Sequence, residues 1–128
     1  MNQKKRILIV DDDPDFAAAI GKILTSAQYE VEKAGSLQGG MKVIEERRPD
    51  LILLDVMMEK YDDGFNMCYD LKHDERYKQI PVIMITAVTE VTGLKFSPDT
   101  DGEYLQADGY LRKPINADVL LEKVASLV

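Results

Sequence analysis

An α/β fold, with a parallel sheet covered by helices on both faces, is predicted by two features of this sequence. Short apolar runs alternate with amphipathic stretches from end to end, which is the pattern of strands joined by crossover helices. Two of the runs, residues 7–10 and 51–54, are apolar at every position, as expected of buried strands. At 128 residues, the chain is long enough for one domain with a single core.

The first strand and helix are expected at the N-terminus. Residues 6–10 form the strand. The helix after it begins at Asp13, a preferred N-cap residue, with Pro14 at the first helical position. Its apolar residues recur at helical spacing and form one stripe, namely Phe16, Ile20, Ile23, Leu24 and Ala27.

The next three elements follow from the same patterns. Residues 29–33 alternate in polarity and predict a short strand. Ser36 is expected to cap a helix that ends near Pro49, and residues 51–54 form the third strand. The inner face of that helix is expected to hold Leu37, Met41 and Ile44.

The second half of the chain is expected to contain a helix after the turn at residues 63–64, with Cys68 facing the core. Strands are expected at residues 82–86 and 108–111, and the last helix should begin near Asn116. The inner face of that last helix is expected to hold Ala117, Leu120, Leu121, Val124 and Val128.

The stretch between Thr86 and Asp108 is longer than a compact α/β unit requires. Its first part, residues 88–96, is helix-like, but residues 97–102 are a cluster of helix-breaking and turn-forming residues. Loops of this length are usually functional or mobile. We therefore expect an atypical extended connection between the fourth and fifth strands.

Composition narrows the classes of function. The net charge is 16 − 23 = −7, which disfavours binding to nucleic acid or to an anionic membrane surface. There is no apolar run of 18 residues, so no membrane span is expected. Cys68 is the only cysteine and cannot form an internal disulfide, which fits a reducing cytoplasm. With His73 as the only histidine, a zinc site or a histidine-based triad has little support.

Carboxylates follow two of the apolar runs. Asp11, Asp12 and Asp13 follow the first strand, and Asp55 follows the third. Helix capping would explain Asp13, but it does not explain the other three together. Several carboxylates at one sheet edge are costly unless a cation or a proton neutralises them. An oxygen-rich cluster without histidine or cysteine suits Mg²⁺ or Mn²⁺, so we predict a metal site there.

Two further polar residues, Thr86 and Lys113, are expected at the same edge. Ligands of open parallel sheets bind at the carboxyl ends of the strands. Four passages of the sequence, taken together, resemble the receiver domain of response regulators in two-component signal transduction. The passages are residues 7–14, 49–58, 81–87 and 108–114, and the resemblance extends over essentially the whole chain.

The resemblance implies a doubly wound, flavodoxin-like sheet with strand order 2-1-3-4-5 and five helices. It implies that Asp55 is the phosphoacceptor and takes a phosphoryl group from a histidine kinase or a histidine phosphotransfer protein. Asp12, Asp55 and the backbone carbonyl of Met57 would hold Mg²⁺ directly, and Asp11 would act through a bound water.

The resemblance also assigns the remaining site residues. Lys113 and the Thr86 hydroxyl would contact phosphoryl oxygens, and Thr86 with Tyr110 would form the conformational switch. The chain would be a signalling switch that catalyses only its own phosphorylation and slow dephosphorylation. Met57 and Val88, two residues after Asp55 and Thr86, have no polar side-chain atom able to orient an attacking water.

A hydrolase and a cofactor carrier are the two alternative classes of function. A metal-dependent aspartyl-phosphate hydrolase needs a second acid two residues after its nucleophile, and that position is Met57. A flavodoxin-like cofactor carrier needs a donor-rich loop after the first strand, where Asp11, Asp12 and Asp13 would repel phosphate. Both alternatives are disfavoured by these residues.

The sequence departs from the family pattern at two places. Glu59 stands where receivers usually have proline, and residues 93–104 are inserted where the fourth helix normally lies. We expect residues 1–128 to be one receiver without an output domain, acting through protein contacts in the cytoplasm as a monomer or weak dimer. Its output is expected to pass to a downstream protein target.

Overall fold

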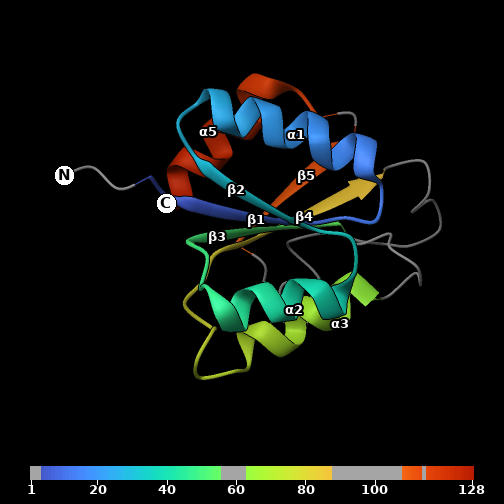
Figure 1. The fold of residues 1–128 in the computed structure, drawn as a ribbon, viewed down its shortest axis with the longest axis vertical. Helices are drawn as coiled ribbons and strands as arrows, with labels where there is room; N and C mark the ends of the chain where they lie inside the picture. The colour runs from blue at the N-terminus through green and yellow to red at the C-terminus, as the bar shows by residue number, and fades with distance from the viewer. Residues whose placement is uncertain (1–3, 56–62, 88–107, 114) are drawn as a thin grey trace.

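The computed structural model describes residues 4–55, 63–87, 108–113 and 115–128, with the backbone only at residues 63–66, 86 and 87 (Figure 1). Five strands in this part of the chain form one parallel sheet in the order β2-β1-β3-β4-β5, as predicted. The strands are β1 (Arg6–Val10), β2 (Glu30–Ala34), β3 (Leu51–Asp55), β4 (Val82–Ala87) and β5 (Gly109–Lys113).

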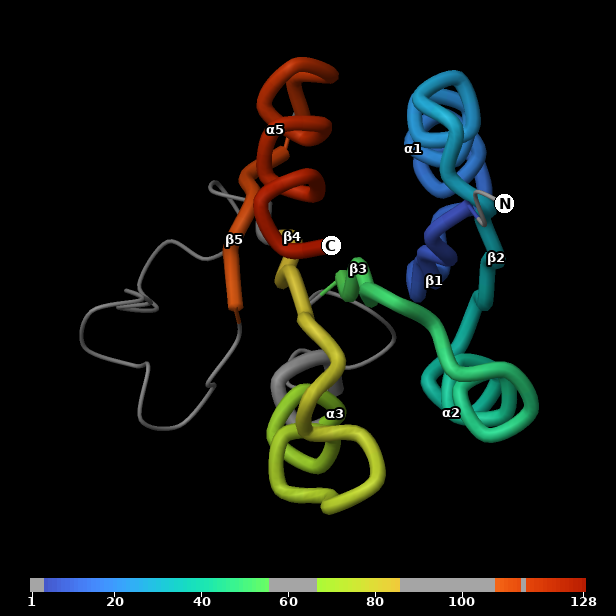
Figure 2. The backbone as a smooth tube through the Cα atoms, turned by 90° about the vertical axis from the view of Figure 1, so that its left-hand side faces the viewer, coloured from blue at the N-terminus to red at the C-terminus, as the bar shows by residue number. Residues whose placement is uncertain are grey.

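In the described part of the chain, four helices lie on the two faces of the sheet. Figures 1 and 2 show α1 and α5 on one face and α2 and α3 on the other. The predicted fourth helix and the extended β4–β5 connection fall within residues 88–107, outside the described residues. None of the described helices combines the length and the apolar character that a membrane-crossing segment requires. The helices are α1 (Pro14–Ser26), α2 (Leu37–Glu46), α3 (Asp63–Lys72) and α5 (Ala117–Leu127).

The central strands are buried on both faces, because their side chains alternate between two core clusters. Leu8, Ile52 and Met84 belong to the cluster under α2 and α3. Ile7, Leu53 and Ile83 belong to the cluster under α1 and α5. This double burial explains why the corresponding runs in the sequence are apolar throughout.

The predicted helix caps are confirmed. The Asp13 carboxylate accepts hydrogen bonds from the backbone N–H groups of Asp15 and Phe16. Ser36 caps α2 and Asn116 caps α5 in the same way. These caps satisfy donors that a helix leaves unpaired in its first turn.

Several predicted strand ends were wrong by one or two residues, and one residue of the last helix was placed on the wrong face. β5 begins one residue later than expected and continues to Lys113, because Ala87 and Lys113 are paired in the ladder. β2 is shifted by one residue, to Glu30–Ala34. Val128 was expected on the inner face of the last helix, but it is exposed, since α5 ends at Leu127 and Val128 extends past the core.

An ion pair between the mostly covered Lys72 side chain and the more exposed Asp108 anchors the start of β5. The Lys72 Nζ lies 2.6 Å from Asp108 Oδ2 and donates to the Ile80 carbonyl at 2.8 Å. The same Asp108 oxygen accepts the backbone N–H of Val82 at 2.8 Å. The end of α3 and the starts of β4 and β5 are therefore held by one set of contacts, which fixes the level at which β5 begins.

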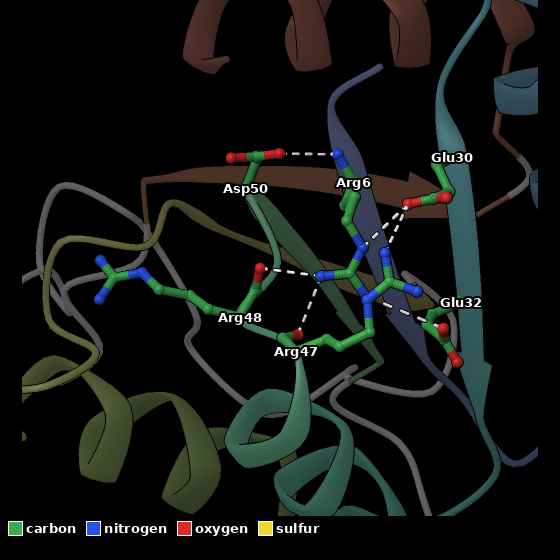
Figure 3. A network of polar contacts seen from close by, with 6 residues as sticks. All are labelled: Arg6, Glu30, Glu32, Arg47, Arg48 and Asp50. Carbon is green, nitrogen blue, oxygen red and sulfur yellow. Dashed lines mark hydrogen bonds and ion pairs between the residues drawn. The ribbon is translucent and has the colours of Figure 1, made fainter. Parts of the chain in front are cut away.

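A second polar network lies at the amino-terminal edge of the sheet. The Arg6 guanidinium donates to the backbone carbonyls of Arg47 and Arg48 at 3.0 and 2.9 Å, and its Nε lies 3.0 Å from Glu30. Arg6 therefore joins the starts of β1 and β2 to the connection between α2 and β3. Figure 3 shows this network, which comprises Arg6, Glu30, Glu32, Arg47, Arg48 and Asp50.

We predict that Arg6→Met lowers the free energy of unfolding by about 1–2 kcal/mol, because two backbone carbonyls lose a charged donor. Arg47→Met is the matched control. The Arg47 side chain is 60% exposed in its ion pair with Glu30, and such pairs contribute only about 0.2–1 kcal/mol. Urea denaturation measures both variants, and equal losses would contradict the role given to Arg6.

Candidate functional site: an acidic cluster at the carboxyl edge of the sheet

Three candidate residues meet at the carboxyl edge because of the sheet register. Asp11 follows Val10, which pairs with Leu54, so Asp11 lies level with Asp55 on the adjacent strand. Lys113 ends β5, two positions beyond Leu111, on the far side of β4. Parallel strands therefore deliver two acids and one base to a single edge.

The same three side chains continue one face of the sheet. In β1, β3 and β5, the preceding residues of the same parity, including Ile9, Leu53 and Leu111, belong to the cluster under α1 and α5. Strand side chains alternate with a period of two, so Asp11, Asp55 and Lys113 are directed toward the α1 side. Their convergence thus follows from strand periodicity.

Lys113 is the counter-ion of the cluster. Its Nζ donates to Asp55 Oδ2 at 3.3 Å and lies 4.0 Å from Asp11 Oδ2. Asp11 and Asp55 are each only 2% exposed, whereas the Lys113 side chain is 26% exposed. Among the described residues, one ammonium faces two buried carboxylates.

Asp11 shows the consequence of this imbalance. Burial, reinforced by the negative charge of Asp55, raises the pKa of Asp11 to about 7, although the Asp13 N–H and Lys113 oppose the rise. Asp11 Oδ1 accepts the Asp13 N–H at 2.8 Å. Within the described part of the chain, Asp11 Oδ2 has no hydrogen-bond partner. A buried oxygen without a donor is costly and favours binding of a proton or a cation.

The donor set fits a hard divalent cation. Asp11, Asp12 and Asp55 each offer a carboxylate oxygen, and these oxygens lie within 4.8 Å of one another. All three ligands are oxygen, which Mg²⁺ and Mn²⁺ accept and which zinc and copper sites seldom use alone. The orphaned oxygen of Asp11 supports the same conclusion.

Of the other predicted site residues, the structure describes Asp12 and Tyr110 in full and Thr86 by its backbone. Asp12 is exposed beside the buried pair, and Asp13 serves as the α1 cap. Tyr110 is half-buried on β5 and packs on the opposite cluster, under α2 and α3. The Thr86 backbone belongs to β4 and pairs with Arg112, whereas the Thr86 side chain and Met57 lie outside the described residues.

The sequence patterns did not identify one residue that contacts the site. Phe16 was predicted only as part of the α1 stripe, but the Lys113 Nζ lies 4.3 Å from the centroid of its ring. Helical spacing places Phe16 on the inner face of α1, and the α1 side is where the three edge residues point. Combining the two periodicities could have identified this contact.

Comparison with known families identifies this arrangement. The profile of the response regulator receiver domain matches residues 7–125, nearly the whole chain. The chain belongs to the response regulator receiver domain family. Receivers are signalling domains rather than classical enzymes, and the predicted fold and family are thereby confirmed.

Relatives of this receiver include transcriptional regulators. RpaA of Synechocystis sp., named as a DNA-binding dual master transcriptional regulator, is 37% identical over 96% of this chain and 48% of RpaA. The phosphate regulon regulatory protein PhoB of Pseudomonas aeruginosa is 36% identical over 97% of this chain and 52% of PhoB. The chain thus spans about half the length of these relatives.

A solved structure of another response regulator has a similar fold. The chemotaxis response regulator CheY4 of Vibrio cholerae superposes with a TM-score of 0.81 and is 26% identical. The alignment covers 98% of this receiver and 100% of that chain.

The pKa of Asp11 predicts the pH dependence of the metal-free receiver. The pKa is raised from 3.8 to about 7, so between about pH 4 and pH 7 the folded state retains a proton that the unfolded chain releases. The free energy of unfolding should therefore fall as pH rises through this window and level off above it. We expect Asp11→Asn to remove this slope and to stabilise the receiver at about pH 8 by roughly 1–3 kcal/mol.

Urea denaturation in the presence of a chelator, at several pH values, measures this effect. Asp12→Asn is the matched control, because its exposed carboxylate is hydrated and should leave the slope in place. A slope that persists in Asp11→Asn would contradict the assignment.

Proposed function

We propose that this receiver is a phosphoacceptor switch in which Asp55 accepts a phosphoryl group from a phosphohistidine on a partner kinase or phosphotransfer protein. The proposal rests mainly on one observation: the buried Asp55 carboxylate lies 3.3 Å from the Lys113 ammonium and beside Asp11. An accessible cation next to a carboxylate nucleophile is what transfer of an anionic group requires.

In the proposed transfer, an Asp55 oxygen attacks phosphorus while the bond from phosphorus to the donor's imidazole nitrogen breaks. The electron pair of that bond returns to the imidazole, which takes up a proton. Lys113 stabilises the negative charge on a phosphoryl oxygen, and the Thr86 hydroxyl is proposed to contact another oxygen.

A divalent cation, Mg²⁺ or Mn²⁺, would be held by Asp12, Asp55 and the Met57 carbonyl, with Asp11 acting through water. When bound, it would supply positive charge that offsets repulsion between the donor and the acidic cluster. The carboxylates that gather within 4.8 Å support this part of the proposal.

The output is proposed to be a change in a protein-binding surface. Movement of Thr86 toward the phosphoryl group would leave room that Tyr110 could fill from β5, as the resemblance implies. The net charge of −7 favours a protein target over direct contact of this receiver with nucleic acid. The cytoplasm, as the site of kinase signalling, is the proposed location.

We predict Mg²⁺-dependent phosphorylation of Asp55. Incubation with acetyl phosphate or phosphoramidate should add one phosphoryl group, detected by intact mass, and chelation or Asp55→Asn should abolish the addition. Asp13→Asn is a matched control: it removes an acid next to the cluster in sequence, and asparagine preserves the helix cap. Labelling that survives Asp55→Asn, or that needs no divalent cation, would overturn the proposal.

We also predict that the phosphorylated receiver decays slowly by itself. Met57 and Val88 offer no polar side-chain atom to orient water, so the lifetime should exceed minutes, and Met57→Asn should change it. Loss of the added mass over time measures the rate. Decay within seconds in the absence of a phosphatase would contradict this reasoning and would favour the hydrolase alternative.

A further inference from the structure

The Phe16 ring contacts the Lys113 ammonium, and the phosphoacceptor mechanism does not by itself require an aromatic residue there. The Lys113 Nζ lies 4.3 Å from the ring centroid and 3.3 Å from Asp55 Oδ2. A cation within about 6 Å of an aromatic face is attracted by the quadrupole of the ring. The ammonium is therefore attracted by two carboxylates and by an aromatic face on a different element.

Phe16 is held in place by the helix cap and by the core. Its backbone N–H donates to the Asp13 cap at 3.2 Å, which holds it in the first turn of α1. Its side chain is half-buried and packs on the core cluster under α1 and α5. Lys113 carries its charge at the end of a flexible four-carbon side chain, which is 26% exposed.

We propose that Phe16 is a positioning residue that holds the Lys113 ammonium over the acidic cluster before the phosphoryl donor arrives. The inference rests on the phosphoacceptor function proposed above. A lysine that is already ordered does not lose its conformational freedom during transfer, so the reaction barrier is lower. If Phe16 were only an apolar core residue, its size and hydrophobicity alone would matter, and the variants below would behave differently.

The test measures the initial rate of Asp55 phosphorylation by phosphoramidate at saturating Mg²⁺. Phe16→Leu keeps an apolar side chain and removes the ring, and we expect the rate to fall between about twofold and thirtyfold. Phe16→Tyr keeps the aromatic face and should restore most of that rate. Mono-, di- and trifluorinated phenylalanine at position 16 keep the shape and weaken the quadrupole, so the rate should fall stepwise along the series.

Two controls separate positioning through Lys113 from a packing defect. In a Lys113→Met background, Phe16→Leu should have little further effect on the rate, because the residue through which the ring acts is absent. The ring-current shift of the Lys113 ε-methylene protons, measured by NMR without any phosphodonor, should be lost in Phe16→Leu and kept in the fluorinated proteins.

Equal rates across the fluorinated series, or a Phe16→Leu effect that persists in the Lys113→Met background, would overturn the positioning role while leaving the phosphoacceptor function intact. Failure of the unmodified receiver to become labelled at Asp55 is a different result. It would overturn the proposed function and, with it, this inference.

Discussion

The burial of two carboxylates against one partly exposed ammonium is the electrostatic constraint on which the site depends. Asp11 and Asp55 are the buried charged side chains in the described part of the chain, and an apolar sheet delivers both to the same edge. Their mutual repulsion and desolvation cannot be relieved by Lys113 alone, so the pKa of Asp11 rises to about 7. The negative charge of this site therefore favours binding of a proton or, as proposed, of a divalent cation.

Two polar networks hold the strands that carry these groups in register. The Arg6 network ties the starts of β1 and β2 to the chain entering β3, and the pair of Lys72 with Asp108 ties α3 to the starts of β4 and β5. Both networks lie at the amino-terminal ends of strands, away from the site. Because strand side chains alternate with a period of two, a shift of one residue in β5 would turn Lys113 to the other face. Contacts at one edge of the sheet thus support the arrangement of the candidate site at the other edge.

The sequence could predict the parts of the molecule that depend on local patterns. Fully apolar runs identified the central strands, and cap residues such as Asp13 identified helix starts. The end of β5 was missed, because Arg112 and Lys113 have the character of a loop and only pairing with β4 makes them part of a strand. The contact between Phe16 and Lys113 was missed for a related reason, since it joins two elements distant in sequence. The proposed roles of Thr86 and Met57 remain predictions.

The most direct test of this account is the number of protons released when Mg²⁺ binds. Calorimetric titration at about pH 7, in buffers with different ionisation enthalpies, measures this number. A site that exchanges the Asp11 proton for a cation should release about half a proton, because the pKa of Asp11 is about 7. The release should vanish in Asp11→Asn and persist in Asp13→Asn. Binding of Mg²⁺ without proton release, or with the same release in Asp11→Asn, would contradict the central role of the buried carboxylate pair.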